Sequence, residues 1–350
     1  MKVIRSYVFF VAALLLGHVL FVWLVDARKD FATGVIRPLV MDSRSEKTIL
    51  YAKAAAESPV TGILLGSSRT LTFQPADLEG ETGLHCFNFA VQSARAEDHL
   101  AIYRWLHAQN KTPKLLVIGY DVELLHNADP IDARLQQNSA LWNQLHPEAA
   151  APNAMRRFLD TMTSEHGVSP ATLFSATYLR DSARSLWLLA NRAPRITDLA
   201  PDGTVRWQNW IAERQAGTFD LSAHINDTKT EYSVRYSRMH GLSEERKKVF
   251  EQLLSEAKSD GAKVVICLLP LNPELHAYVA DKCNYDGLLH QTVSFLHELS
   301  AKYGCDLKDC TDPLRIGLSP DEWFDGAHVT EHNAAQVMHY ALAASPAPRN

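Results

Sequence analysis

Short apolar runs alternate with amphipathic segments along most of the chain. The runs that predict buried strands lie at residues 62–65, 86–91, 115–118, 263–269 and 305–307. The segments with helical spacing of apolar positions lie at 46–57, 96–109, 243–259, 288–303 and 331–344. Such runs are too short for core helices and end at turn residues. Strands that alternate with helices indicate an α/β fold, in which helices cover both faces of a mostly parallel sheet.

The first apolar run is longer and has a different meaning. Residues 7–25 carry no formal charge, and as a helix they would extend ~28 Å, close to the ~30 Å of a bilayer core. Lys2 and Arg5 precede the run, which predicts a cytoplasmic N-terminus and an extracytoplasmic main domain. The alternative is a cleaved signal peptide, but the flank after Val25 offers no small-x-small cleavage site. We therefore expect a single-pass anchor.

The alternation of strands and helices is interrupted once. Residues 127–240 contain four of the seven tryptophans and a helical pattern at 170–191, and they are too many for a loop between two strands. We predict a cytoplasmic tip and anchor at 1–30, the first part of the α/β domain at 31–126, a mainly helical inserted cap at 127–240, and the second part of the α/β domain at 241–350.

Composition excludes several classes of protein. Hydrophobic residues make up 46% of the 350 residues, so the chain can form a core and is not disordered throughout. The net charge of −5, without a basic stripe, argues against nucleic acid as a partner. Five cysteines are too few for a disulfide scaffold. An oxidising compartment favours one disulfide among Cys283, Cys305 and Cys310, but the sequence does not fix the pair.

Two short motifs suggest nucleophilic catalysis. Gly66-Ser67-Ser68-Arg69 directly follows the first predicted strand, where a parallel sheet forms its sites. A serine needs a base to remove its proton, and that base needs an orienting acceptor. Asp325 and His328, three residues apart just before the last helix, can supply this pair. A serine at the start of the domain and an Asp–His pair at its end form a plausible triad.

This order of motifs resembles the SGNH (GDSL-like) hydrolase superfamily over about 60–125 and 245–345. It is most similar to the membrane-anchored branch related to O-acyltransferases and esterases of cell-surface polymers. The resemblance implies a three-layer α/β sandwich in which Ser68 is the nucleophile, His328 the general base and Asp325 the residue that orients it. It implies no cofactor and no metal.

The resemblance also implies an oxyanion hole, and here the sequence departs from the family. Asn88, Ala90 and Ser93 lie in the second of the sequence motifs that carry the resemblance, and Ala90 and Ser93 stand where the family commonly has glycines. The resemblance implies that the N–H groups of Ser68 and Ala90 donate to the oxyanion. Asp121 stands where the family has a donating asparagine. An ionised carboxylate has no proton to donate and would repel an oxyanion. Arg69, beside the nucleophile, is expected either to hold an anionic substrate or to pair with a buried carboxylate.

These patterns lead to two main functional hypotheses and a third, an esterase that acts on lipids while its membrane anchor holds the site near the bilayer. The first is a serine esterase or O-acyltransferase, anchored in the bacterial inner membrane, that acts on acyl groups, such as acetyl, of a periplasmic carbohydrate polymer. The second is a catalytically degenerate binding or assembly subunit of an envelope-polymer biosynthesis complex, which the aspartate at position 121 favours. A zinc-protease pattern at His328–His332 is the weaker alternative for the last motif, because Thr330 is a natural N-cap and places His328 before the helix.

Overall fold

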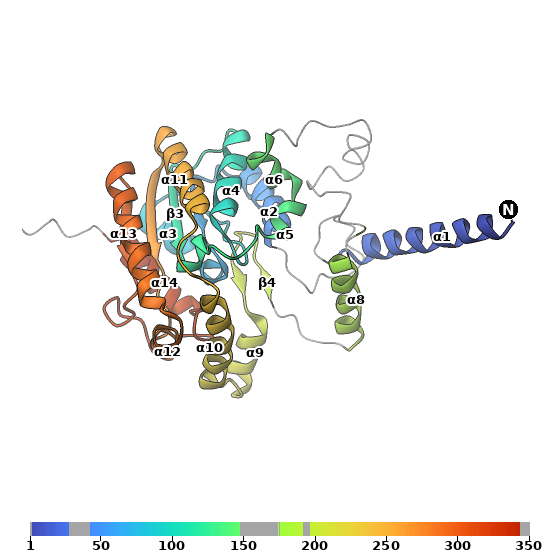
Figure 1. Ribbon diagram of the computed structural model, residues 1–350. Helices are drawn as coiled ribbons and strands as arrows, with labels where there is room; N and C mark the ends of the chain where they lie inside the picture. The colour runs from blue at the N-terminus through green and yellow to red at the C-terminus, as the bar shows by residue number, and fades with distance from the viewer. Residues whose placement is uncertain (1, 28–42, 148–173, 175, 192–196, 344–350) are drawn as a thin grey trace, which may run out of the picture. The chain divides into compact units, whose positions relative to one another are not determined.

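The computed structural model describes residues 2–27, 43–147, 174, 176–191 and 197–343 (Figure 1). Its helices are α1 (Lys2–Val25), α2 (Ser43–Glu57), α3 (Pro75–Thr82), α4 (Ala96–Ala108), α5 (Ala133–Gln137), α6 (Ser139–Leu145), α8 (Ala176–Ala190), α9 (Gln208–Ala216), α10 (Leu221–Ser237), α11 (Glu244–Ser259), α12 (Pro273–Cys283), α13 (Tyr285–Tyr303) and α14 (Glu331–Leu342). Its strands are β1 (Gly62–Leu65), β2 (Cys86–Asn88), β3 (Leu115–Tyr120), β4 (Asp198–Leu199), β5 (Val205–Arg206), β6 (Lys263–Leu268) and β7 (Asp306–Asp309). Two 3₁₀ turns, η1 (Ser68–Thr70) and η2 (Val122–Leu125), follow β1 and β3.

The chain divides into two compact units. Unit 1 comprises Met1–Ile49 and Asp132–Thr197, and unit 2 comprises Leu50–Ile131 and Asp198–Asn350. The sheet and every candidate site residue named above lie in unit 2. The last part of the predicted insertion, from Asp198 to residue 240, belongs to the same compact unit as the sheet.

The core of unit 2 is a parallel sheet of five strands, in the order β2-β1-β3-β6-β7. All neighbouring pairs run in parallel, for example Gly62 beside Leu115 and Val117 beside Val265. The chain moves outward in one direction from β1 to β2 and in the other from β3 to β6. The order therefore reverses between β1 and β3, and the carboxyl ends of strands flanking such a switch point are where doubly wound sheets bind ligands.

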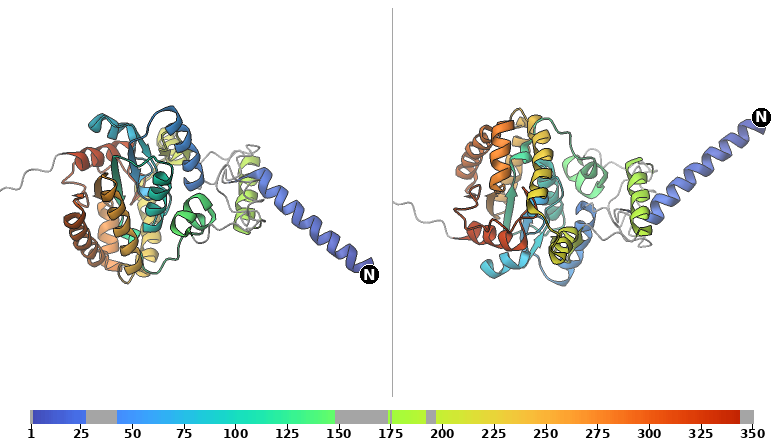
Figure 2. Two further views of the ribbon diagram at one scale, coloured as in Figure 1. Left: turned by 90° about the horizontal axis from the view of Figure 1, so that it is seen from above. Right: turned by 90° about the horizontal axis from the view of Figure 1, so that it is seen from below.

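Helices cover both faces of this sheet, which confirms the predicted α/β class (Figures 1 and 2). On one face, Leu78 of α3 and Val337 and Met338 of α14 join a buried cluster with Leu64 and Val265. On the other face, α4, α11 and α13 pack side by side, and Phe250 of α11 contacts the ring of Tyr120 with centroids 5.2 Å apart. Both faces of each central strand are buried, so those strands read as continuous apolar runs.

The limits of several elements differ from those expected. The second apolar run is a strand only at Cys86–Asn88, because the chain then turns toward the end of β1. Pro273 starts α12, a helix that is not among the predicted segments, since a proline fits the first helical position but also commonly ends a strand. The start of the helix predicted at 170–191 lies outside the described residues, and α8 accounts for the rest.

All five cysteines are free thiols in the structure. The Sγ atoms of Cys267, at the end of β6, and Cys310, just after β7, lie 3.1 Å apart in the core. Neither Cys283 nor Cys305 pairs with Cys310, so the expected disulfide among these three cysteines is absent from the described residues. Burial places Cys267 and Cys310 in a contact that the spacing of cysteines along the chain did not reveal.

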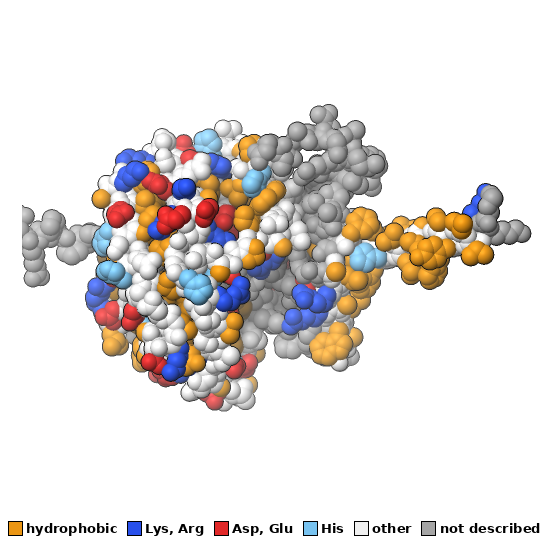
Figure 3. Space-filling model, in the orientation of Figure 1, with side chains coloured by type: hydrophobic (Ala, Val, Ile, Leu, Met, Phe, Trp, Pro, Cys, Tyr) orange, Lys and Arg blue, Asp and Glu red, His pale blue; other side chains and the backbone are white. Residues whose placement is uncertain are grey.

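Unit 1 contains the N-terminal apolar helix. Within the described residues, Val3–Val25 is the one helix long and apolar enough to cross a membrane. Its side chains are largely exposed and apolar, as Figure 3 displays along α1. The helix is compatible with the predicted single-pass anchor.

Candidate active site

The turn that carries Ser68 sits tightly against the carboxyl ends of β1 and β3. Gly66 directly follows β1, and Gly119 is the second-last residue of β3. A Cβ atom at either position would overlap the side chain of Thr70, the last residue of η1. Both glycines are therefore required by close approach of the 3₁₀ turn to the sheet. This contact places Ser68 at the switch point between β1 and β3.

Ser68, His328 and Asp325 form a continuous hydrogen-bond relay. The Ser68 Oγ lies 3.0 Å from Nε2 of His328, and Nδ1 of His328 lies 2.9 Å from Oδ2 of Asp325. A carboxylate accepts hydrogen bonds, so its contact assigns the imidazole proton to Nδ1 and leaves Nε2 to accept the serine proton. Ser68 and His328 are half-buried, whereas Asp325 is buried. The three residues predicted to form a triad are thus brought together within hydrogen-bond reach.

Asp325 is held as an anion. Burial would raise its pKa, but the charge of His328 and hydrogen bonds from the His328 ring and the N–H groups of Ala327 and His328 lower it below its usual range. Both N–H groups donate to Oδ1 over 2.7 Å. The loop itself is fixed by the Asn272 N–H, which donates to the carbonyl of Gly326 over 2.9 Å. The carboxylate is therefore oriented before any substrate arrives.

Asp121 lies beneath the serine turn and is neutralised there. Arg69 Nη1 lies 2.8 Å from Asp121 Oδ1, and both side chains are buried. Ser67 Oγ donates to Asp121 Oδ2 and accepts from the N–H of Arg69 over 3.2 Å. The expected repulsion between Asp121 and an oxyanion assumed that the charge of Asp121 has no partner. In the structure that charge is paired with Arg69. Of the two roles expected for Arg69, the structure gives the partner of a buried carboxylate.

The electrostatics of this pair follow from its burial. Burial alone would lower the pKa of Arg69, but the charge of Asp121 raises it above its usual range, so the guanidinium stays protonated. Burial raises the pKa of Asp121, while Arg69 and the Ser67 hydroxyl oppose that rise. Arg69 Nη2 also donates to the carbonyl of Pro270, just after β6. One arginine thereby connects the ends of β1, β3 and β6.

Asn88 and Ala90, expected near the oxyanion hole, make other hydrogen bonds in the structure. The Ala90 N–H, expected in the oxyanion hole, instead donates to Oδ1 of Asn88 over 2.9 Å. The Asn88 amide donates to the carbonyls of Thr70 and Phe73 over 2.9 and 2.7 Å. Asn88 thus ties β2 to the segment that follows the serine turn. These two residues are structural.

Ser93 is the member of this motif with an exceptional backbone. Its φ of +55° lies in the left-handed region, which explains why a glycine would suit this position. Val91, two residues earlier, donates its N–H to the carbonyl of Gly66 over 3.0 Å, so this loop runs beside the serine turn. Among the described residues, the N–H groups of Ser68 and Ser93 have no hydrogen-bond partner.

An aromatic wall stands beside His328. The rings of Trp207 and Trp210 have centroids 5.5 and 5.9 Å from the imidazole, and Trp210 stacks on Phe324 with centroids 5.3 Å apart. Trp207 is buried, and Trp210 is half-buried. The sequence singled out tryptophans of the predicted cap but could not place these two at the triad.

A short hairpin explains how this wall reaches the site. β4 and β5 form an antiparallel pair just before α9. The Val205 N–H donates to the carbonyl of Leu71, which follows η1, over 2.8 Å, and the Asn88 N–H donates to that of Asp202 over 2.9 Å. The hairpin is therefore fixed to the turn that carries the nucleophile, and Trp207 follows directly.

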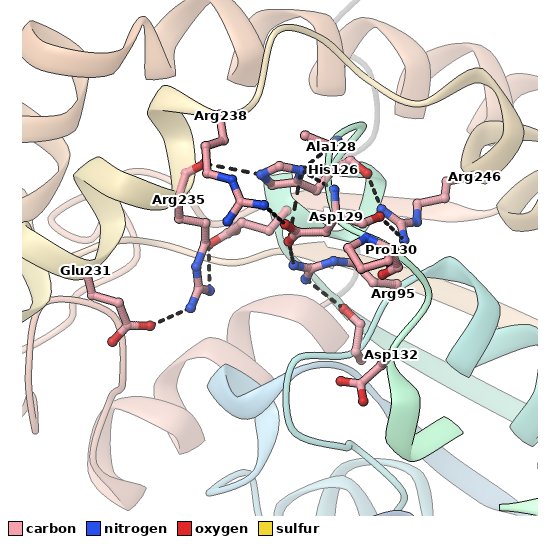
Figure 4. A network of polar contacts seen from close by, with 12 residues as sticks. Arg95, His126, Ala128, Asp129, Pro130, Asp132, Glu231, Arg235, Arg238 and Arg246 are labelled. Atoms are coloured by element: carbon pink, nitrogen blue, oxygen red, sulfur yellow. Dashed lines mark hydrogen bonds and ion pairs between the residues drawn. The ribbon is translucent and has the colours of Figure 1, made fainter. Parts of the chain in front are cut away.

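The segment after η2 is anchored by a partly buried polar network (Figure 4). Asp129 Oδ2 lies 2.7 Å from Nη2 of Arg95, and Arg246 Nη2 donates to the Asp129 carbonyl over 3.0 Å. Arg246 Nε also lies 3.0 Å from Glu97 Oε1. His126 accepts at Nδ1 from the Ala128 N–H over 3.1 Å, and burial lowers its pKa. This network fixes the chain that follows η2.

The zinc-protease pattern is not assembled. His328 faces Ser68, whereas His332 is exposed on α14, which starts at Glu331. In the part of the chain that the structure describes, no group of three or more His, Cys, Asp or Glu side chains is placed to hold a metal ion.

Comparison with known proteins adds no family to this geometry. No family model matches the chain, and no curated protein is similar enough to match it.

Proposed function

We propose that the protein is a serine esterase or O-acyltransferase of the SGNH type that acts on acyl groups of an extracytoplasmic carbohydrate polymer. The observation that carries this proposal is the Ser68–His328–Asp325 relay, with contacts of 3.0 and 2.9 Å. A nucleophile, a base and an orienting carboxylate in hydrogen-bond reach are the signature of acyl transfer on several unrelated folds. The position of Ser68 after the first strand and of the Asp–His pair before the last helix supports the SGNH assignment.

The relay implies a two-step reaction. His328 Nε2 takes the proton of Ser68 as Oγ attacks the acyl carbonyl, and Asp325 stabilises the imidazolium that forms. His328 then gives the proton to the departing alcohol, which leaves an acyl group on Ser68. In the second step His328 activates water, which yields a free acid, or a second hydroxyl, which yields a transferred acyl group.

The oxyanion of each step needs donors. We assign this role to the N–H groups of Ser68 and Ser93, because among the described residues neither has another partner and Val91 holds their loops together. Backbone donors aimed at developing charge are worth about 10²–10³ in rate each. Asp121 takes no part as a donor, because its carboxylate accepts from Ser67 and pairs with Arg69.

The aromatic wall supports a carbohydrate substrate. Binding sites for small molecules combine aromatic surfaces with a few polar groups, and the half-buried Trp210 beside His328 provides such a surface. Sugar rings present apolar C–H faces that pack on indole rings, so an acyl ester on a sugar would be held next to the relay. The apolar helix Val3–Val25, with Lys2 and Arg5 at its N-terminal end, supports a periplasmic location at the bacterial inner membrane.

Active-site labelling tests the proposal. The full chain in detergent micelles is treated with a fluorophosphonate probe and is assayed for hydrolysis of an aryl acetate and of acetylated polysaccharide. We expect labelling and turnover in the wild type and in Ser237→Ala, an exposed serine on α10, and loss of both in Ser68→Ala. The loss in kcat is expected to be roughly 10⁴-fold or more.

Two other results would contradict a catalytic role of Ser68. Equal labelling of wild type and Ser68→Ala, or turnover that Ser68→Ala leaves unchanged, would exclude a Ser68 nucleophile. Absence of both activities in the wild type, together with binding of the polysaccharide by wild type and Ser68→Ala alike, would favour a binding subunit of an envelope-polymer complex.

A further inference from the structure

Helix α8 packs against the end of α1 within unit 1. Val22, Val25 and Ala27 form a buried apolar cluster with Tyr178, in the first turn of α8. The Tyr178 hydroxyl donates to Oδ1 of the buried Asp26 over 2.9 Å. Val25 is the last residue of the apolar helix. These contacts therefore hold the start of α8 at the point where α1 ends.

This position fixes the depth of α8 relative to a membrane. Packed helices lie about 8–10 Å apart between their axes. A helix of this length extends about 22 Å, too short to span a hydrocarbon core of about 30 Å. With α1 across the bilayer, α8 lies at the level of the lipid headgroups and of the parts of the acyl chains next to them.

The side chains of α8 are distributed in an unusual way. The small polar residues Ser182 and Ser185 are buried, whereas Leu179 and Trp187 are exposed, with 62% of the Trp187 surface accessible. Helical spacing places Leu179, Ala183 and Trp187 on one side of the helix. The apolar side of the helix thus faces away from the protein among the described residues.

Two arginines border this apolar side. Arg180 and Arg184 are both exposed and lie one helical turn apart. Figure 3 displays basic and apolar side chains next to each other on this helix. An apolar side with Trp and Leu, bordered by arginines, is the pattern of a helix that lies in the interface of a bilayer. Tryptophan is enriched at this depth, since its ring is apolar and its N–H is polar.

We propose that α8 is an interfacial helix that lies on the lipid surface beside the exit of α1, with Leu179 and Trp187 among the acyl chains and Arg180 and Arg184 on anionic headgroups. The lipid is the occupant that the structure favours, because the contact with α1 brings this surface to the bilayer. The helix would give unit 1 a second membrane contact. This proposal does not depend on the catalytic function.

Contact quenching of tryptophan fluorescence tests the proposal. The full chain is reconstituted into vesicles of phosphatidylcholine and phosphatidylglycerol, in which part of the lipid is brominated near the headgroup end of its acyl chains. Bromine quenches a tryptophan that touches it. The fluorescence that Trp187→Phe removes is expected to be quenched by the brominated lipid. The fluorescence that Trp105→Phe removes is expected to be unquenched, because Trp105 packs on Tyr51 and Phe89 in unit 2.

The charge reversal Arg180→Glu with Arg184→Glu tests the headgroup contact. In vesicles that contain phosphatidylglycerol, the double variant is expected to lose part of the quenching of Trp187, whereas in phosphatidylcholine alone it should match the wild type. Flotation with the vesicles verifies that α1 remains inserted. Floating protein in which Trp187 is no more quenched than Trp105 would overturn the proposal and would point to a protein, such as a second copy, over this surface. Quenching that the charge reversal leaves unchanged in both vesicles would overturn the role of the arginines.

Discussion

Arg69 and Asp121 form a buried ion pair beneath the turn that carries Ser68, with 2.8 Å between Nη1 and Oδ1. The pair joins the carboxyl ends of two neighbouring strands, β1 and β3. Ser67 stands between them, since its hydroxyl donates to the carboxylate and accepts from the Arg69 N–H. An aspartate that looks unfavourable for catalysis in the sequence is therefore part of the support of the nucleophile.

Removal of one charge of this pair should destabilise the fold. In Asp121→Asn the guanidinium of Arg69 is left buried without its anion, which costs about 3–5 kcal/mol. Denaturant unfolding, with the midpoint and slope compared to wild type, measures this change. Asp286→Asn is the matched control, because its ion pair with His276 is exposed and its loss should stay within about 1 kcal/mol. Equal losses of unfolding free energy in Asp121→Asn and Asp286→Asn would contradict a stabilising role of the buried pair.

Moving the carboxylate from position 121 to position 67 should recover part of the lost unfolding free energy. Ser67→Asp alone puts two carboxylates beside one arginine, and like charges at this distance repel. In the double variant Ser67→Asp with Asp121→Asn, a single carboxylate again faces Arg69. The double variant is expected to be more stable than the sum of the single losses predicts, with a coupling of about 1–3 kcal/mol. Strict additivity in unfolding free energy would show that the two positions do not share the charge.

Ser93 offers a test of the oxyanion hole. A non-glycine residue at φ +55° stores strain of about 1–3 kcal/mol. We expect Ser93→Gly to keep kcat and to raise the unfolding temperature or leave it unchanged. Ser93→Val should lower both, because a β-branched side chain is least compatible with this backbone. Ala90→Gly, three residues earlier in the same loop and with its N–H donating to Asn88, is the control and should leave kcat within a few-fold. A fall of kcat in Ala90→Gly but not in Ser93→Val would reverse the assignment of the donor.

The sequence predicted much of this site because its signals are local. The strand before Ser68 and the helix after His328 are apolar patterns of a few residues, and the triad follows from their order on a parallel sheet. The ion pair of Arg69 with Asp121 depends instead on the register of β1 with β3, which no local pattern encodes. The same holds for Trp207 and Trp210, because their place beside His328 depends on the hydrogen bonds of the β4–β5 hairpin. Contacts between residues far apart in the chain cannot be predicted until the fold is known.

Stability should depend on pH through a buried histidine. Burial lowers the pKa of His99 to about 4 from 6.5, although the charge of Asp98 opposes the change. Between these values the unfolded chain binds a proton that the folded chain does not. The stabilisation present above pH 6.5 is therefore lost as the pH falls toward 4, by roughly 3 kcal/mol.

The measurement is the unfolding free energy at pH values from 7 down to 4, for wild type, His99→Leu and His107→Gln. The fall should be smaller in His99→Leu by the amount that His99 contributes. His107, on the same helix, is exposed, so its variant should follow the wild type. Parallel curves for wild type and His99→Leu would mean that His99 keeps its ordinary pKa in the fold.

Substitution of Trp210 should separate substrate binding from chemistry. Its ring stacks on Phe324 and lies beside His328 without a hydrogen bond in the relay. In Trp210→Ala a sugar ring loses its aromatic contact, worth about 0.5–1.5 kcal/mol, so KM for an acetylated polysaccharide should rise roughly 3- to 10-fold. The hydrolysis of a small aryl acetate should change less, because that substrate needs only the relay and the oxyanion donors. Equal losses for both substrates would assign Trp210 to the support of His328, whereas a loss confined to the polysaccharide would establish the aromatic wall as the carbohydrate subsite.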